Sequence, residues 1–349
     1  MKQHKKPFRL SNLPNSLYVL FVVFIAASLA VPKFLTPGNL SNLILQSSIL
    51  LLLSFGMSLV LMTGCIDLSV GGILSMTGVV MATMLRMNVP AIWAIAIGLL
   101  TGVLFGTMNG LLITKLRLPS FITTFATMGI AQSIANVVSE KRTVYWDPKP
   151  SNSLIDTLGK DFIRIEFGQT AKEVLTISYL VLITAVVITV VMLLFNKTTL
   201  KSRVFAIGEN EEIARLAGIK THFWQIGIYA ASGLLAAMAS LLVLIRTNSL
   251  QPTTGEGLEF QAVVAAVLGG NTLKGGKGSL TGTILGALAL YSVRSALSLA
   301  GIDTSVVMIV IGAVLILGMW LNETIQMYEE RIVGMLRSIL MGRNHGHNA

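Results

Sequence analysis

The chain has 349 residues, of which 53% are hydrophobic and only 12% are charged, and its formal net charge is +10. Because a soluble domain carries about 25% charged residues, this composition excludes an ordinary soluble protein and indicates a membrane protein. The basic residues stand dispersed at the edges of apolar segments, without interleaved aromatic residues, so the positive charge does not indicate a nucleic-acid partner.

Ten apolar segments follow one another along the chain, and most approach the ~20 residues that a helix needs to cross the hydrocarbon of a lipid bilayer. The eighth segment is short and the third begins in glycine, so either of them spans the membrane or re-enters it as a broken helix. The sequence predicts an all-α, polytopic membrane protein with about ten transmembrane or re-entrant helices. The predicted segments are residues 14–34, 42–63, 69–86, 90–114, 119–138, 174–196, 223–246, 258–273, 279–300 and 303–321.

The orientation follows from the lysines and arginines, which accumulate on the cytoplasmic side of membrane segments. Placing the N-terminus in the cytoplasm puts most of them inside, so both termini are predicted to be cytoplasmic. A cleaved signal peptide is an alternative for the first segment, because lysines precede it and Ser28-Leu29-Ala30 resembles a cleavage site. The predicted division is an N-terminal tail (1–13), a membrane domain (14–321) with an outer loop (139–173) and a cytoplasmic loop (197–222), and a C-terminal tail (322–349).

A few polar residues lie in or near the apolar segments, where burial without a partner is costly. Asp67 is the strongest functional candidate, because an ionisable group at membrane depth marks a functional site by default. The competing interpretation, which the sequence favours, is an N-cap for the helix that begins near Leu68. The candidates for the lining of a solute path are Gln46, Ser47, Asp67, Asn109 and Ser120.

The cytoplasmic loop contains the stretch NKTTLKSRVFAIGENEEIARLAGIKTH, residues 196–222, which predicts a short helix. Asn210 is a good N-cap, acidic residues follow it in the first turn, and Gly218 is a C-terminal stop. Ile213, Leu216 and Ala217 would share one apolar face, which suits docking in a groove of a partner. The alternative is a surface helix that lies on its own membrane domain.

Glycines recur in two related stretches of the chain. The stretch GGNTLKGGKGSLTG, residues 269–282, lacks the spacing of a phosphate-binding loop. Residues 67–80 align without a gap on residues 271–284, which predicts two weakly related halves, as many transporters have. The glycines either pack tightly against a neighbouring helix, which is favoured, or leave backbone N–H groups facing a cavity. The predicted helix-turn glycines are Gly71, Gly72, Gly275 and Gly276.

At these residues the sequence resembles the permease subunits of ribose-type ATP-binding cassette importers, a family that also serves galactose, xylose, arabinose and a furanone-type autoinducer. The resemblance covers nearly the whole chain, with two departures: Gly64-Cys65 stands where the family commonly has Gly-Gly, and Glu212 where many members have Ala. The motifs that carry it are GCIDLSVGG (64–72), AIGENEEIARLAGI (206–219) and AVVAAVLGGNTLKGGKGSLTGTILGAL (262–288).

The resemblance implies an importer subunit and not an enzyme, in which two permease subunits form the path for a sugar or a similar small polar solute. Cytoplasmic ATPase subunits bind ATP and Mg²⁺, so no cofactor or metal is expected on this chain, and a periplasmic or extracellular binding protein delivers the solute. The second permease subunit is an identical or a different chain, and the complex lies in the bacterial cytoplasmic (inner) membrane. By resemblance, the residues that couple this chain to the ATPase are Gly208, Asn210, Ala214, Arg215, Leu216 and Gly218.

A self-contained secondary transporter for a small polar solute is the alternative. Such proteins bury several carboxylates or histidines as proton relays, whereas the apolar segments of this chain hold few ionisable residues. A membrane enzyme is less favoured still, because no catalytic constellation of side chains emerges from the sequence.

Overall fold

The computed structural model describes residues 15–146, 153–166, 174–303, 305–314 and 316–317. The elements in chain order are α1 (Asn15–Ala30), α2 (Pro37–Leu61), α3 (Val70–Arg86), α4 (Ala91–Lys115), α5 (Ser120–Val138), β1 (Val144–Tyr145), α6 (Ser153–Leu158), β2 (Asp161–Glu166), β3 (Val174–Ser178), α7 (Tyr179–Lys197), α8 (Leu200–Glu209), α9 (Glu211–Leu216), α10 (Thr221–Thr247), β4 (Ser249–Leu250), α11 (Leu258–Leu268) and α12 (Leu280–Leu299). Beyond the labelled elements, which end with α12, a further short apolar helix spans Ser305–Val314.

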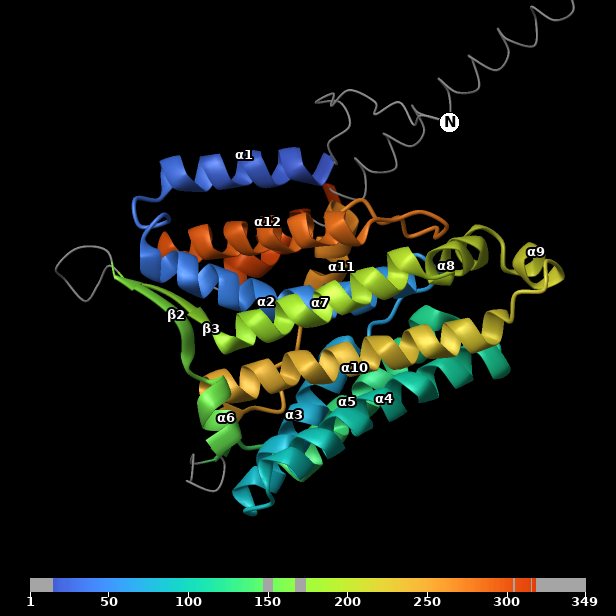
Figure 1. Ribbon diagram of the computed structural model, residues 1–349, viewed down its shortest axis with the longest axis horizontal. Coiled ribbons are helices and arrows are strands. Elements are labelled where there is room, and N and C mark those ends of the chain that lie inside the picture. The colour runs from blue at the N-terminus through green and yellow to red at the C-terminus, as the bar shows by residue number, and fades with distance from the viewer. Residues whose placement is uncertain (1–14, 147–152, 167–173, 304, 315, 318–349) are drawn as a thin grey trace, which may run out of the picture.

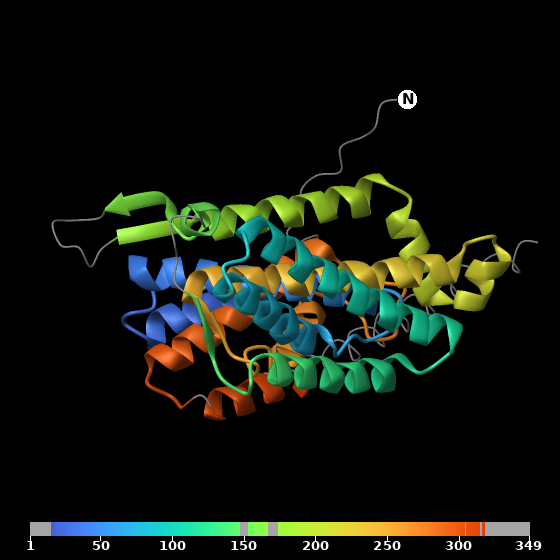
Figure 2. The same cartoon turned by 90° about the horizontal axis from the view of Figure 1, so that it is seen from below.

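Most of these helices lie side by side with their axes roughly along one direction (Figures 1 and 2). Within the described residues, six helices are long and apolar enough to cross a membrane, namely α2, α4, α5, α7, α10 and α12. The β2–β3 hairpin lies at one end of the bundle and α9 at the other (Figure 1). Each predicted apolar segment contains a helix, which confirms the all-α, polytopic fold class.

The third and eighth predicted segments form the shorter helices α3 and α11. With 11 residues, α11 rises about 17 Å, which is roughly half of the ~30 Å hydrocarbon thickness, so it does not cross a bilayer by itself. With 17 residues, α3 rises about 26 Å. Both helices are buried along most of their length. A helix can end at membrane depth only where other protein or a water-filled cavity surrounds its backbone, and here other protein does.

The core of the bundle forms around α2, whose residues from Ser47 to Leu61 are all buried. This stretch is apolar on every side, as expected for a helix surrounded by other helices, and α2 packs against α10, α11 and α12. Close packing of α4 on α10 depends on glycines spaced four residues apart. A Cβ on Gly106 would lie 2.1 Å from the carbonyl oxygen of Tyr229, so only glycine lets the two backbones approach this closely.

The prediction was wrong about the start of the segment 174–196. Val174–Ser178 is strand β3, which pairs antiparallel with β2, and α7 begins only at Tyr179. Apolar β-branched residues suit a strand as well as the end of a membrane helix. The partner strand β2 lies earlier, within the loop 139–173, so the pairing was not visible within the segment itself. A second short ladder pairs β1, in the loop 139–173, with β4, which follows the end of α10.

The predicted tails lie outside the described residues. This applies to the N-terminal tail (1–13) and to the C-terminal tail (322–349).

Candidate functional site

The short helix predicted in the loop 197–222 forms where the sequence predicts it. It is α9, and the side-chain oxygen of Asn210 accepts a hydrogen bond from the backbone N–H of Ile213 at 2.9 Å. After the helix, Gly218 has a φ of +84°, a left-handed conformation that glycine adopts without strain and that ends helices. The position of α9 at the end of the bundle leaves it projecting from the membrane helices (Figure 1).

One face of α9 rests on its own chain and another is uncovered. Ala214 is 3% exposed, whereas Ile213 is 63% and Leu216 is 81% exposed. Of the other predicted coupling residues, Asn210, Arg215 and Gly218 are also exposed, and Gly208 is half-buried. Two large apolar side chains that face solvent side by side on a rigid helix form a surface suited to a protein partner.

Replacing Asn210 with alanine is expected to loosen α9. Loss of an N-cap side chain costs about 1 kcal/mol, because the Ile213 N–H loses its acceptor. Hydrogen exchange of the α9 amides should therefore quicken about five-fold. The matched control is Asn196→Ala on the exposed end of α7, which should leave α9 unchanged. Equal α9 exchange rates in the wild type and Asn210→Ala would contradict the capping role.

Gly208, near the end of α8, packs on the backbone of two connections that lie far away in the sequence. A Cβ placed on Gly208 would lie 2.1 Å from the carbonyl oxygen of Met62 and 2.4 Å from the backbone nitrogen of Gly276. The Gly276 N–H also donates to the Met62 carbonyl at 3.0 Å. A Cβ on Gly275 would lie 2.5 Å from the nitrogen of Gly64. We call these five residues the glycine junction: it joins the end of α8 to the α2–α3 and α11–α12 connections.

The four predicted helix-turn glycines divide into two pairs. Gly275 and Gly276 lie in the α11–α12 connection with positive φ angles, whereas Gly71 and Gly72 lie in the first turn of α3 itself. A Cβ on Gly71 would lie 2.5 Å from the carbonyl oxygen of Gly255, and one on Gly72 would lie 2.7 Å from that of Met128. All four glycines therefore pack against neighbouring backbone.

Asp67 and Asn109 belong to one fully buried network of hydrogen bonds. One oxygen of Asp67 accepts from the Ser69 backbone N–H at 3.0 Å and from the Ser69 hydroxyl at 2.5 Å. The other oxygen accepts from the Ser232 hydroxyl at 2.8 Å, and Asn109 donates to the Ser69 hydroxyl oxygen at 2.7 Å. Both Asp67 and Asn109 are 0% exposed. The carboxylate thus holds the connection before α3 against α10, and Ser69 links it to α4. Asp67 is not the N-cap that the sequence favoured, because α3 begins only at Val70 and the cap position falls on Ser69.

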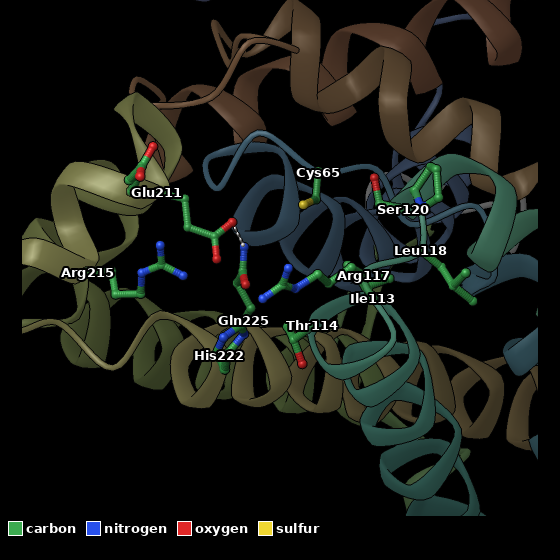
Figure 3. A pocket seen from close by; sticks show the side chains of 12 residues that line it. Cys65, Ile113, Thr114, Arg117, Leu118, Ser120, Glu211, Arg215, His222 and Gln225 are labelled. Carbon is green, nitrogen blue, oxygen red and sulfur yellow. Dashed lines mark hydrogen bonds between the residues drawn. The ribbon is translucent and has the colours of Figure 1, made fainter.

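Of the other path candidates, Ser120 contacts the residue before Asp67, whereas Gln46 and Ser47 lie far from it on α2. Ser120, at the start of α5, accepts from the Ile66 N–H at 3.4 Å and lines a cavity together with Cys65 (Figure 3). Gln46 and Ser47 lie on α2. Ser47 is about 21 Å along the helix from Leu61, the end of α2 that leads to Asp67. The Ser47 hydroxyl is buried and has no hydrogen-bond partner among the described residues. The structure therefore does not bring the five candidates together.

A second buried centre, Asn271, was missed as a functional candidate. Its side chain donates to the Ala266 carbonyl at 2.7 Å and to the hydroxyls of Thr283 at 2.9 Å and Ser58 at 3.2 Å, and it accepts from the Ser279 N–H at 3.1 Å. It is 0% exposed. The alignment of residues 67–80 with 271–284 was the available signal, because it places Asn271 at the position of Asp67. Each half thus has a buried polar residue with several hydrogen bonds, Asp67 or Asn271, shortly before a helix whose first turn contains glycine, α3 or α12.

Comparison with known proteins identifies the family of this chain. A family model described as "Branched-chain amino acid transport system / permease component" matches residues 39–319. The chain belongs to this permease family. It is 37% identical to the ribose import permease protein RbsC of Bacillus subtilis over 87% of this chain and 90% of the relative, and 33% identical to that of Escherichia coli K12 over 88% and 93%. The L-arabinose ABC transporter permease protein AraH of Azospirillum brasilense is 31% identical over 90% and 89%.

These relatives confirm the resemblance to ribose-type permeases drawn from the motifs. The protein is a multi-pass membrane permease, a transport subunit and not an enzyme, and proteins of this kind work with an ATPase and a binding protein. No solved structure matches the chain.

Proposed function

We propose that this permease forms the membrane path of an ATP-driven importer for a sugar or a closely similar polar solute. The names of the ribose and arabinose permeases that align with nearly the whole chain support the solute class. The observation that carries the ATP-driven mechanism is the uncovered apolar face of α9, Ile213 and Leu216, on a helix anchored through Ala214. This face offers a docking surface to a cytoplasmic ATPase subunit, which binds the ATP and Mg²⁺.

The glycine junction supplies a physical route from the ATPase to the membrane helices. ATP binding draws the ATPase subunits together, and the docked α9 moves with them. Because Gly208 lies in backbone contact with Met62 and Gly276, this motion reaches the starts of α3 and α12, one from each half of the chain. An ATPase can shift the membrane domain between two states only if its contacts differ between them. Backbone packing without intervening side chains makes this link stiff.

The proposal extends to the remaining parts of the importer. The protein lies in the bacterial cytoplasmic membrane, and α9 and both chain termini are on the cytoplasmic side. The binding protein docks at the opposite end of the bundle, which carries the β2–β3 hairpin (Figure 1). A second permease subunit, most simply an identical chain, completes the path. Gln46, Ser47 and Ser120 are our candidates for contact with the solute, whereas we assign Asp67 and Asn109 to holding α3 in place.

Co-purification with the ATPase subunit encoded beside this chain tests the proposal. Arg215→Glu reverses an exposed charge on α9, and Gly218→Pro removes the left-handed residue that ends it. The amount of ATPase that co-purifies with each variant should fall at least about ten-fold below the wild-type amount. Lys197→Glu, on the exposed end of α7, is the matched charge-reversal control and should retain the ATPase. Undiminished ATPase binding by both α9 variants would place the docking surface elsewhere.

A further inference from the structure

A cavity of about 530 Å³ lies between α9, the turn from α4 to α5, and the start of α10. This volume lies within the ~300–1,000 Å³ range of small-molecule sites. The cavity opens at the α9 end of the bundle and does not include the Asp67 network. We name it the α9 cavity. Its polar side chains come from α4, the α4–α5 turn, α5, α9 and α10 (Figure 3).

Two arginines from opposite walls converge in the α9 cavity. Arg117 belongs to the α4–α5 turn and Arg215 to α9, and Figure 3 shows their side chains extending toward each other with Gln225 between them. Neither guanidinium lies within ion-pair distance of a carboxylate in the described part of the chain. The lining also holds the carboxylates of Glu211 and Glu212, so the two guanidinium groups share the cavity with two acidic side chains. The planar donor geometry of a guanidinium matches that of a phosphate.

The remaining polar groups of the cavity indicate more than a bare anion. Glu211 accepts a hydrogen bond from Gln225 at 3.4 Å and faces the cavity with its carboxylate (Figure 3). A carboxylate repels a phosphate but accepts hydrogen bonds from hydroxyl groups. His222 also lines the cavity, and its Nδ1 atom is buried without a partner among the described residues. Donors at the centre and an acceptor beside them suit a ligand that carries one phosphate and several hydroxyl groups.

We propose that the α9 cavity binds a phosphorylated sugar from the cytoplasm and that this ligand restrains transport. The proposal rests on the proposed function, because an imported sugar is the substrate of a kinase and the phosphorylated sugar is the product of that reaction class. The ligand would bridge Arg215 on the coupling helix and Arg117 on a turn between membrane helices. Bridging these elements holds α9 against the membrane domain, so accumulation of the product slows further import.

Binding is measured on the full-length permease in lipid nanodiscs by isothermal titration calorimetry. The probes are ribose 5-phosphate, ribose and inorganic phosphate. The wild type should bind ribose 5-phosphate, and Arg117→Gln should weaken this binding by about ten-fold to one hundred-fold. Arg117→Lys should retain part of the affinity, because it keeps the charge but loses the two parallel hydrogen bonds. Lys197→Gln, which removes a charge outside the cavity, should bind like the wild type. Thermal unfolding of each variant confirms that it is folded.

Absence of ribose 5-phosphate binding by the wild type, or binding that Arg117→Gln leaves unchanged, would overturn the proposal. Inorganic phosphate binding as tightly as ribose 5-phosphate would assign the cavity to free phosphate and overturn its sugar specificity. Failure of the proposed function is a separate result: the wild-type chain would not co-purify with the ATPase subunit. A complex that imports sugar but binds no ribose 5-phosphate would overturn only the inference about the cavity.

Discussion

Replacing Gly208 with alanine is expected to uncouple ATP hydrolysis from solute uptake. The added methyl group would lie 2.1 Å from the Met62 carbonyl oxygen and 2.4 Å from the Gly276 nitrogen. Both neighbours are backbone atoms that no change of rotamer can move aside, so the end of α8 must separate from the α2–α3 and α11–α12 connections. Overpacking of this kind costs about 1–3 kcal/mol and sometimes more. We expect uptake to fall at least about ten-fold, while the ATPase stays bound because α9 is intact.

Uptake into proteoliposomes, ATPase activity and co-purification are measured on the same preparation of this variant. Gly227→Ala is the matched control, because a Cβ at this position on α10 meets nothing within 4 Å. This control should transport like the wild type. If Gly208→Ala imports solute at the wild-type rate, the glycine junction does not carry the coupling motion. If it loses the ATPase altogether, the junction instead shapes the docking surface.

Replacing Asn271 with alanine is expected to destabilise the membrane domain by about 2–4 kcal/mol. The substitution removes the acceptor of the Ser279 N–H at the start of α12 and the donor to the Ala266 carbonyl at the end of α11. The Ala266 carbonyl keeps the backbone N–H of residue 271 as a donor at 3.1 Å, whereas the Ser279 N–H loses its acceptor, which costs about 1–3 kcal/mol in a buried site. The lost hydrogen bonds to Ser58 and Thr283 add to this cost. Asn271→Asp keeps the acceptor but sets a carboxylate against the Ala266 carbonyl, so it should also be destabilising.

The midpoint of thermal unfolding in nanodiscs checks this prediction. Asn196→Ala, an exposed asparagine at the end of α7, serves as the control and should change the midpoint little. A wild-type midpoint for Asn271→Ala would show that water or another group replaces the lost hydrogen bonds. It would also remove the structural equivalence of Asn271 with Asp67 in the other half.

The sequence by itself determined the features that depend on local chemistry. Apolar length fixes which segments become membrane helices, because unpaired backbone groups cannot remain in hydrocarbon. The ends of α9 are equally local: the cap by Asn210 closes on a residue three positions away, and Gly218 supplies the positive φ that ends the helix. The alignment of the two glycine-rich stretches was also readable, and it placed Asp67 and Asn271 at corresponding positions.

Only the tertiary structure decided what these elements touch. The sequence offered two interpretations of the glycines, and the contacts of Gly208 with Met62 and Gly276 join segments that no local pattern connects. The same holds for the pairing of β2 with β3, and for the convergence of Arg117 and Arg215 in one cavity (Figure 3). Local propensity acts over a few residues, whereas these contacts arise from how whole helices pack, and packing depends on the shape of every neighbouring side chain at once.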